Sequence, residues 1–430
     1  MGPEVLIPNP WMITPFLLLL GAIALGPLVS AGLWQKHYPK VAIGLGSVTF
    51  VYYAVALRAT HRLLEVGHEY VSFIVLIGSL FVVSGGIHIN VKGEATPRAN
   101  TVLLFIGAVI SNLLGTTGAS MLLIRPWLRM NKYRLTAHHV VFFIFIVSNV
   151  GGCLTPIGDP PLFLGYLKGV PFWWVAQHCW PMWAAGVGLL LLMFWIVDTR
   201  NYRKAPKKVR EEVAEPPDTW KFEGLWNLVW LAAILGAVFI NHPIFLREGI
   251  MLAASAASYL TTRKQVHDAN HFNFHPIREV AFLFIGIFVT MIPALDWLQA
   301  NAARLADPNP SLFYWGAGTL SSCLDNAPTY LSFLSAALGS FGNPSLAEKA
   351  QIAALLKEPG FRDCLVAISV GSVFFGACTY IGNGPNFMVK SIADHQKAHA
   401  PGFLRYIWAF TLPFMLPMLL IVWLLFIVRW

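Results

Sequence analysis

The sequence predicts an all-α polytopic membrane protein that consists of two inverted repeats, each with five membrane crossings, a re-entrant hairpin and a broken helix. The first supporting observation is composition, because 56% of the 430 residues are hydrophobic and only 12% are charged, whereas soluble proteins typically carry about 25% charged residues. The second is that two similar motifs containing Gly and Pro interrupt long apolar segments. The third is that most Lys and Arg residues lie in loops between apolar segments, as expected for a membrane topology.

Apolar segments with few charged residues predict where the chain crosses the membrane, since a helix needs about 20 residues to span a bilayer. The expected uninterrupted spans are 11–33, 40–58, 70–90, 171–198, 224–240, 243–262, 278–297 and 403–428. The first segment is long and lacks the small-residue cleavage site of a signal peptide, so we expect it to remain in the mature protein.

Two related motifs predict broken helices. Thr155 begins the sequence T-P-I-G-D-P-P, and Thr379 begins the sequence T-Y-I-G-N-G-P. Gly and Pro do not sustain a helix, and polar groups in the middle of a membrane segment are costly unless they bind something. We therefore expect broken helices at 136–169 and 362–395, with ligand groups at the two breaks.

Two longer segments upstream of these motifs predict re-entrant hairpins. The segments 99–130 and 311–341 carry Asn, Gly, Thr or Pro near their centres. A length of about 30 residues with a central break suits a helix pair that enters and leaves on one side better than a single span. Asn112 and Asn326 take matching places in the two hairpins, so the repeated order of hairpin and broken helix indicates a tandem duplication.

These elements divide the chain into two repeats and a linker. We expect 1–198 to form the first inverted repeat, 199–223 a cytoplasmic linker and 224–430 the second inverted repeat. A hairpin adds no crossing, so each half crosses the membrane five times, and an odd number inverts the second half relative to the first. Because Lys and Arg then fall mainly on the cytoplasmic side, we predict a multi-pass protein of the inner (plasma) membrane with both termini outside.

Charge and cysteine usage argue against other classes of protein. The formal net charge is +9, but the basic residues form no patch on a soluble domain, so no nucleic-acid partner is expected. The five cysteines lack C-x-x-C pairs, so neither a disulfide framework nor a zinc site is expected.

Polar residues at the four breaks predict a shared cation site. Where a helix is interrupted inside the membrane, freed backbone carbonyls and side-chain oxygens become ligands for Na+. The candidate cation- or substrate-binding residues are Ser111, Asn112, Thr116, Thr117, Asn149, Thr155, Asp159, Asp325, Asn326, Thr329, Thr379 and Asn383. The expected Na+ ligands among them are Asn112, Asp159, Asp325 and Asn326. Apart from this transported or coupling ion, no cofactor is expected.

Asp159 and Asp325 carry most of the predicted chemistry, because each is the acidic residue of an otherwise uncharged apolar run. A carboxylate at that depth can exchange a proton for a cation, so both are expected to couple transport to protons. Asn383 stands at the place that matches Asp159, so Asp325 is expected to be the more critical of the two. The simpler interpretation is that each aspartate caps a half-helix.

An intramembrane aspartyl protease is a further class that two membrane aspartates could form. Pro156 stands where the G-x-G-D motif of that class has a glycine, and the duplication explains both aspartates without catalysis. We therefore expect no enzyme activity and no catalytic residue.

The chain resembles the ion transporter superfamily that includes NhaD-type sodium/proton antiporters, arsenite permeases, citrate–metal symporters and sodium/dicarboxylate transporters, and is most similar to the NhaD-type antiporters and the citrate transporters. Residues 155–161 resemble the T-x-I-G-D stretch of the NhaD-type and melanosomal P-protein branches, and residues 324–329 resemble a D-N-x-P-T hairpin tip. The resemblance implies sodium sites at the hairpin tip and helix break of each half, with substrate between them. In the dicarboxylate branch both tips carry Ser-Asn-Thr, whereas here Leu113 follows Asn112 and Asp325 replaces the second serine.

The resulting hypothesis is a sodium/proton antiporter that works by alternating access, with Asp159 and Asp325 exchanging H+ for Na+. The alternative is a cation-coupled symporter of citrate or another carboxylate, which the Ser, Asn and Thr residues at the tips favour. No Lys or Arg falls at a predicted break, so a carboxylate would be held by metal ions, amides and hydroxyls. The expected partners are Na+, H+ and the lipid bilayer, with Li+ as a further ion and a homodimer left open.

Overall fold

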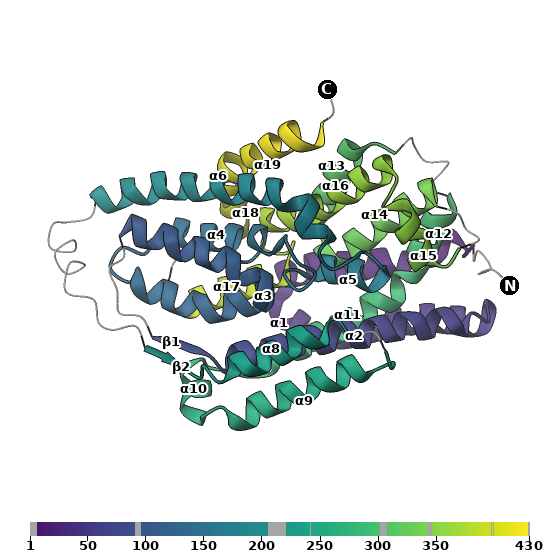
Figure 1. Ribbon diagram of the computed structural model, residues 1–430, viewed down its shortest axis with the longest axis horizontal. Coiled ribbons are helices and arrows are strands. Elements are labelled where there is room, and N and C mark those ends of the chain that lie inside the picture. Colours follow the sequence, from purple (N-terminus) through teal and green to yellow (C-terminus); the bar gives the residue numbers. More distant parts are fainter. Residues whose placement is uncertain are drawn as a thin grey trace.

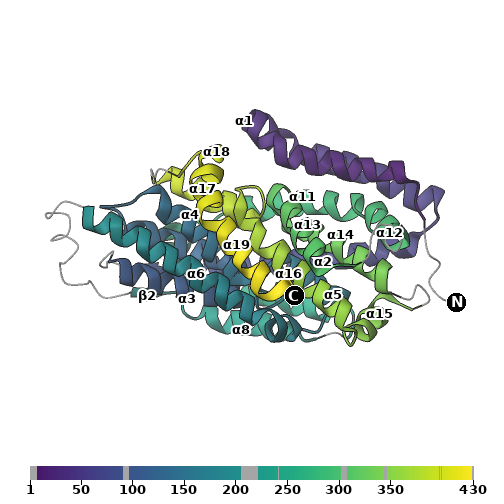
Figure 2. The ribbon, with the colours of Figure 1, turned by 90° about the horizontal axis from the view of Figure 1, so that it is seen from above.

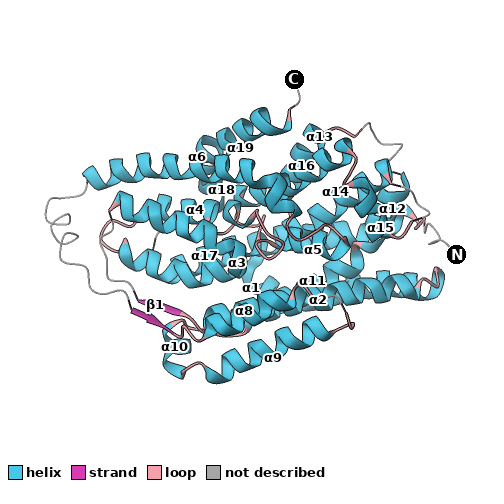
Figure 3. Cartoon of the chain, in the orientation of Figure 1, coloured by secondary structure: helices cyan, strands magenta, loops and turns pink. Residues whose placement is uncertain are grey.

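The computed structural model describes residues 7–90, 96–204, 221–240, 242–301, 308–342, 346–396, 398 and 400–428. Within these residues the chain is almost entirely helical (Figure 3). Most of the long helices run roughly along the longest axis of the molecule (Figure 1). The protein is therefore an all-α membrane protein, as the composition predicts.

The helices of the first half are α1 (Thr14–Val51), α2 (Thr60–Gly85), α3 (Pro97–Met130), α4 (Ala137–Ile146), α5 (Pro160–Lys168) and α6 (Trp174–Lys204). Turns of 3-10 helix lie at Pro10–Ile13 and Val150–Gly152, and a π-helical turn lies at Tyr52–Ala56.

The helices of the second half are α8 (Asn227–Ala237), α9 (Leu246–Thr261), α10 (Lys264–Ala269), α11 (His275–Thr290), α12 (Ile292–Asn301), α13 (Pro310–Cys323), α14 (Asn326–Phe341), α15 (Glu348–Leu355), α16 (Pro359–Phe375), α17 (Gly384–His395), α18 (Phe403–Tyr406) and α19 (Leu416–Val422). A 3-10 turn lies at Gly376–Cys378, and π-helical segments lie at Ile407–Met415 and Trp423–Ile427.

Among the described residues, seven helices are long and apolar enough to cross a membrane. They are Gly32–Ala56, Thr60–Gly85, Pro97–Met130, Trp174–Lys204, His275–Asn301, Pro359–Cys378 and Phe403–Ile427. Pro10–Gly26, Ala137–Gly152 and Asn227–Ala237 are apolar but shorter. The span expected at 243–262 corresponds to α9, which has 16 residues and includes the buried charges of Arg247 and Glu248. The chain is thus a multi-pass membrane protein.

A sharp reversal divides α1 into two arms. Ser30 has non-helical dihedral angles (φ −158°, ψ 95°), and a Cβ added at Gly26 would meet the Trp34 ring at 2.6 Å. Eight residues of a straight helix span about 12 Å, so the chain turns back on itself here. At the other end, the Asn9 amide donates to the Tyr52 hydroxyl at 3.1 Å. The two arms match the two spans expected in this part of the sequence.

Two helical hairpins point into the molecule from opposite ends (Figure 1). In the first, which is α3, the Asn100 and Asn131 side chains exchange hydrogen bonds of 2.8 and 3.1 Å, so the ends of a 34-residue segment lie side by side. In the second, formed by α13 and α14, the rings of Phe313 and Phe333 have centroids 6.0 Å apart. We call these segments hairpin 1 and hairpin 2.

The helices form two groups, and both hairpins belong to the second of them. α2 packs against α8, α9 and α11, which lie together along the lower side of Figure 1. Hairpin 1, α4, α5 and α6 form the other group with the helices that follow α12. Figure 2 shows the same molecule from above, with α1 along one edge and α19 packed beside α6.

The structure contains a short two-stranded sheet that the sequence did not predict. β1 (His88–Asn90) pairs antiparallel with β2 (Lys221–Glu223), with Ile89 opposite Phe222. β2 falls within the linker expected at 199–223, and α6 continues into its first residues. The remaining linker residues, 205–220, lie outside the described residues.

Candidate functional site

Each broken helix is interrupted where a glycine packs against backbone. In the first, α4 ends at Ile146 and α5 begins at Pro160, and a Cβ at Gly158 would overlap the Gly152 carbonyl. In the second, a Cβ at Gly382 would lie 2.6 Å from the Gly376 carbonyl oxygen. Proline in the first turn of α5 then restarts the helix, because its fixed φ suits the N-terminal turn. The irregular backbone between the helical pieces is therefore built by close glycine contacts.

The tip of hairpin 1 is bound to the first break. Gly115 reverses the chain with φ +73° and ψ 157°, a conformation that L side chains rarely adopt. The next residue, Thr116, donates its backbone N–H to the Gly158 carbonyl at 2.8 Å. The Thr116 side chain is thereby placed beside Asp159, the last residue before α5.

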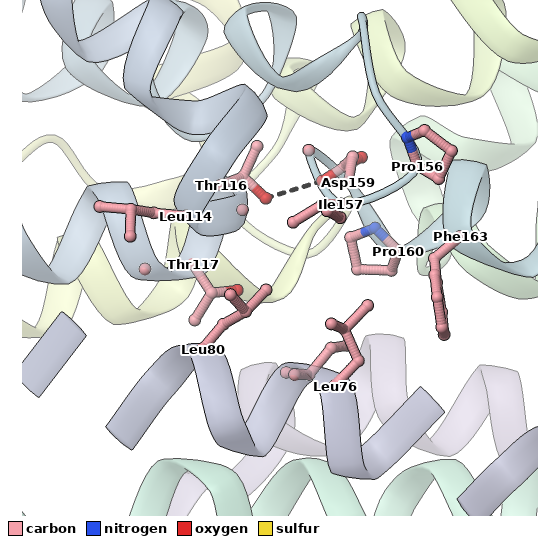
Figure 4. Close-up of a pocket in the computed structure, with 14 residues that line it drawn as sticks. Leu76, Leu80, Leu114, Thr116, Thr117, Pro156, Ile157, Asp159, Pro160 and Phe163 are labelled. Atoms are coloured by element: carbon pink, nitrogen blue, oxygen red, sulfur yellow. Dashed lines mark hydrogen bonds between the residues drawn. The ribbon is translucent and has the colours of Figure 1, made fainter. Parts of the chain in front are cut away.

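Asp159 lies at the point where both halves meet, and it is only 1% exposed. Its Oδ1 accepts hydrogen bonds from the Thr116 hydroxyl at 2.7 Å and from Asn383 Nδ2 at 3.0 Å. Its Oδ2 accepts from Asn326 Nδ2 at 2.5 Å. Figure 4 shows the contact with Thr116. The three donors come from hairpin 1, hairpin 2 and the second break, and all three are uncharged.

A second group of amides continues this network. Asn149, from the first break, donates to the Asn386 side chain at 2.7 Å and accepts from Asn383 at 3.2 Å. Asn386 in turn donates to the carbonyls of Gly376 and Thr379 at 2.8 and 2.9 Å, which holds the second break in place. Asn386 is not among the residues expected from the sequence. Its position three residues after Asn383, on the same helix face, was the available signal.

Four of the expected site residues use their side chains to bind backbone. The Ser111 hydroxyl donates to the Val147 carbonyl at 2.7 Å, and Asn112 donates to the Gly151 carbonyl at 2.7 Å and accepts from the Leu154 amide at 2.9 Å. The hydroxyls of Thr155 and Thr379 donate to hairpin carbonyls at 2.6 Å. In this arrangement these residues join each hairpin to its broken helix.

Three others form no hydrogen bond with the Asp159 carboxylate in the described part of the chain. Asp325 is half-buried and caps α14, where its Oδ1 accepts from the Ala327 amide at 3.0 Å. The Thr329 hydroxyl donates to the Asp325 carbonyl at 3.0 Å. Thr117 lines the cavity described below, and within the described residues its side chain is not hydrogen-bonded to Asp159. The structure therefore gathers Thr116, Asn326 and Asn383 around one aspartate.

The hydrogen bonds also revise how the two hairpins correspond. Thr155 donates to the carbonyl of Asn112, whereas Thr379 donates to the carbonyl of Ser322. Ser322, and not Asn326, is therefore the counterpart of Asn112. The same register matches Asn326 with Thr116, and both donate to Asp159. The sequence pairing of Asn112 with Asn326 was wrong because it aligned identical residues rather than equivalent contacts.

A small cavity lies beside Asp159 (Figure 4). It is lined by the hairpin 1 tip, the first break and α2, with Leu76, Leu80 and Phe163 among its apolar walls. Its volume is about 20 Å³, and a water molecule needs roughly 10–15 Å³ measured in this way. Nearby, the Asn326 Oδ1 is buried and forms no hydrogen bond within the described residues. This space suits a bare ion or water better than an organic anion.

An ion-pair group joins the two helix groups at the far end of α5. Lys168, the last residue of α5, is buried, and its Nζ lies 2.9 Å from both Glu69 on α2 and Glu348 on α15. Burial alone would raise the pKa of Glu348, but Lys168 and Arg62 outweigh burial and lower it. Because α2 and α5 also line the cavity, these ion pairs hold its two walls together at one end.

A second buried polar group fastens the open end of hairpin 1. The Asp198 carboxylate is fully buried and is paired with Arg134, with Nη2 at 2.8 Å. It also lies 3.1 Å from Nε2 of His138 and of His139, and accepts from Asn100 at 3.0 Å. Two histidines and a carboxylate could in principle bind a metal ion, but the guanidinium already occupies this carboxylate. We interpret the group as an anchor between hairpin 1, α4 and α6.

Comparisons with known proteins agree with this architecture. Inner membrane protein YbiR of Escherichia coli (strain K12) is 23% identical over 248 residues, which cover 57% of this chain and 63% of YbiR. The aligned region is therefore less than two thirds of that relative's length. The pattern of one protein family matches residues 7–427. Because that match covers nearly the whole chain, the protein belongs to the family described as "Putative citrate transport".

Proposed function

We propose that the protein is a sodium/proton antiporter in which the Asp159 carboxylate binds H+ and Na+ in turn. The observation that carries this proposal is the position of Asp159. It is buried, it touches no basic side chain among the described residues, and its three hydrogen-bond donors come from both halves of the chain. A carboxylate in such a place can be neutralised by a proton or by a cation.

The energetic balance of the site supports exchange. A hydrogen bond to a charged group is worth roughly 1.5–3 kcal/mol, so the three bonds to the ionised carboxylate contribute about 5–9 kcal/mol. Removing an ion from water costs several kcal/mol in a protein interior. The two quantities are of the same size, so the protonated and the ionised carboxylate are similar in free energy and a cation can compete with the proton for this group. The free Asn326 Oδ1 and the helix ends at the breaks supply further oxygen ligands.

Inverted repeats and alternating access are part of the same proposal. The open end of hairpin 1 lies near the short sheet, whereas the open end of hairpin 2 lies at the opposite end of the molecule (Figure 1). Two re-entrant hairpins of opposite orientation whose tips meet at Asp159 suit a site that is reached from either side in turn. We accordingly place both termini outside and the 199–223 linker in the cytoplasm, in the inner (plasma) membrane.

The second candidate is a cation-coupled symporter of citrate or another carboxylate. The family match favours it, since that family is described by citrate transport. Against it, a carboxylate substrate at the centre would face Asp159, and the cavity there has a volume of only about 20 Å³. The conformation described here would have to open before an organic anion could enter.

Flux measurements in everted vesicles separate the two candidates. An antiporter releases protons when Na+ or Li+ is added, without any carboxylate present, and Asp159→Asn abolishes this exchange because an amide does not titrate. Asp394→Asn, an exposed change on α17, serves as a control and should exchange normally. Citrate uptake that rises with external Na+, without cation-driven proton movement, would establish the symporter instead.

A further inference from the structure

A groove with a volume of about 380 Å³ lies on hairpin 1, apart from the cavity beside Asp159. Its lining begins at Thr96, at the open end of the hairpin, and extends to Ile106 on the first arm. Ile106 is still nine residues from the turn at Gly115. Ligand sites in proteins usually measure about 300–1,000 Å³, so this groove is large enough to hold a ligand that does not reach the central site.

Most of the groove is apolar and both arms of the hairpin contribute to it. Leu103 on the first arm and Met130 at the end of the second are buried, whereas Val102 and Ile106 are 51% and 42% exposed. Pro97–Met130 is one of the segments that are long and apolar enough for a membrane. An exposed apolar surface on such a segment faces acyl chains of the bilayer rather than water.

The length of the groove matches the depth of one leaflet. Arg98 and Ile106 are eight residues apart, which corresponds to about 12 Å along a helix. The hydrocarbon core of a bilayer is about 30 Å thick, so one leaflet accounts for about 15 Å. Because Arg98 stands next to the first residue of the apolar segment, the groove extends from the membrane surface through most of one leaflet. A phospholipid has this shape, whereas a water-soluble anion would leave the apolar part uncovered.

Arg98 supplies the charge at the surface end of the groove. Its side chain is exposed, and none of the described residues that line the groove is acidic. The other polar residue is Thr96, whose hydroxyl accepts a hydrogen bond from the Ala99 amide at 3.2 Å. Arginine binds phosphate through charge-assisted hydrogen bonds. The charge of the groove is therefore complementary to a phosphate headgroup.

We propose that this groove binds an anionic phospholipid, with the headgroup phosphate at Arg98 and an acyl chain against Leu103 and Met130. A zwitterionic lipid carries its own cation beside the phosphate, so the single positive charge of Arg98 favours a lipid with net negative charge. Neither the transported ion nor the substrate enters this argument, so the inference does not depend on the proposed function. A lipid held against both arms would stabilise the end of hairpin 1 that lies opposite its tip.

Native mass spectrometry of the purified full-length protein measures the binding of individual lipids. Phosphatidylglycerol should bind more tightly than phosphatidylcholine with the same acyl chains. Arg98→Gln should reduce this preference by roughly 5-fold, the contribution of one basic residue near an anionic lipid, whereas Arg98→Lys keeps the charge and should retain it. Arg129→Gln is the matched control, because Arg129 is exposed at the end of the second arm but does not line the groove.

A second pair of variants tests the apolar part of the groove. Val102→Trp places a large ring where the acyl chain is expected and should remove the tighter binding of phosphatidylglycerol. Val109→Trp lies on the same arm at a position that is 43% exposed but outside the groove, and it should bind lipid as the wild type does. Glycerol 3-phosphate carries the headgroup phosphate without acyl chains, so an excess of it should not displace the lipid.

Four results would overturn the proposal. They are equal binding of the two lipids to the wild type, equal losses in Arg98→Gln and Arg129→Gln, equal effects of the two Trp variants, and displacement of the lipid by glycerol 3-phosphate. Thermal unfolding of each variant identifies misfolding, and the Arg98 and Val102 changes test the groove independently if one of them is unstable. Sodium/proton exchange is not measured in this experiment, so rejection of the lipid site would leave the proposed function standing.

Discussion

Thr116→Val is the sharpest test of the central site, because it removes one hydrogen-bond donor and changes little else. The Thr116 hydroxyl donates to Asp159 Oδ1 at 2.7 Å, and valine keeps nearly the same volume without that donor. A bond of this kind to an ionised carboxylate is worth roughly 1.5–3 kcal/mol. Since one pH unit corresponds to about 1.36 kcal/mol, the pH of half-maximal exchange should rise by about 1–2 units.

The direction of the shift in pH follows from which form of the carboxylate loses a hydrogen bond. The hydroxyl stabilises the charged form, so without it the proton is held more tightly and is released only at higher pH. Na+-driven proton release in everted vesicles, recorded with a fluorescent pH dye over a range of pH values, measures the shift. At a fixed pH near neutrality the variant should therefore exchange more slowly than the wild type.

Thr117→Val is the matched control for this experiment. Thr117 lines the same cavity one residue further along, but it has no hydrogen bond to Asp159 within the described structure. Its pH profile should coincide with that of the wild type. An unchanged profile for Thr116→Val, or equal shifts in both variants, would show that Asp159 does not set the pH dependence through this contact.

Further predictions concern binding and stability. Asn326→Ala should weaken Na+ binding, measured by titration calorimetry, by roughly 1–3 kcal/mol, because it removes both a donor to the buried carboxylate and an unpaired oxygen. Asp198→Ala should lower the free energy of unfolding by about 3–5 kcal/mol, since the buried Arg134 guanidinium then loses the carboxylate with which it forms its buried ion pair; an effect below 1 kcal/mol in denaturant unfolding would contradict the anchor. Lys168→Met should destabilise the protein in the same assay by leaving Glu348 without its closest cation. The pKa of Glu348 is lower in the folded protein than its ordinary value of 4.5, so the ionised carboxylate stabilises the fold above about pH 4.5. The free energy of unfolding should therefore fall as the pH drops below that value, and Glu348→Gln should reduce this dependence on pH.

The sequence located the breaks better than it located the contacts between them. Gly and Pro in an apolar segment indicate a break locally, and the repeated motifs placed Asp159 and Asn383 at corresponding points. Which polar residues then meet depends on the register of each hairpin, and a shift of a few residues exchanges one donor for another. Thr116 and Asn326 therefore face Asp159, while Asn112 holds backbone groups.

Deciding which of the two aspartates is more critical also required knowledge of the contacts between the hairpins and the breaks. From sequence alone Asp325 was expected to be the more critical, because Asn383 replaces aspartate at the place that matches Asp159. In the structure Asp325 is half-buried and caps a helix, whereas Asp159 is buried and receives three donors. A role of Asp325 in proton coupling stays a prediction, tested by Asp325→Asn. The anchor at Asp198 could not be predicted, since its partners are more than 50 positions away.

The Asp159–Asn383 pair determines the electrical character of the proposed cycle. These residues occupy matching breaks and are hydrogen-bonded to each other at 3.0 Å, so the two halves share a single carboxylate. If one Na+ replaces one H+ on that carboxylate, each turnover moves no net charge across the membrane. Exchange would then respond to the ion gradients but not to the membrane voltage. A second aspartate that released its proton without binding a Na+ of its own would make the cycle generate current, so a voltage clamp of proteoliposomes tests whether more than one proton moves for each Na+.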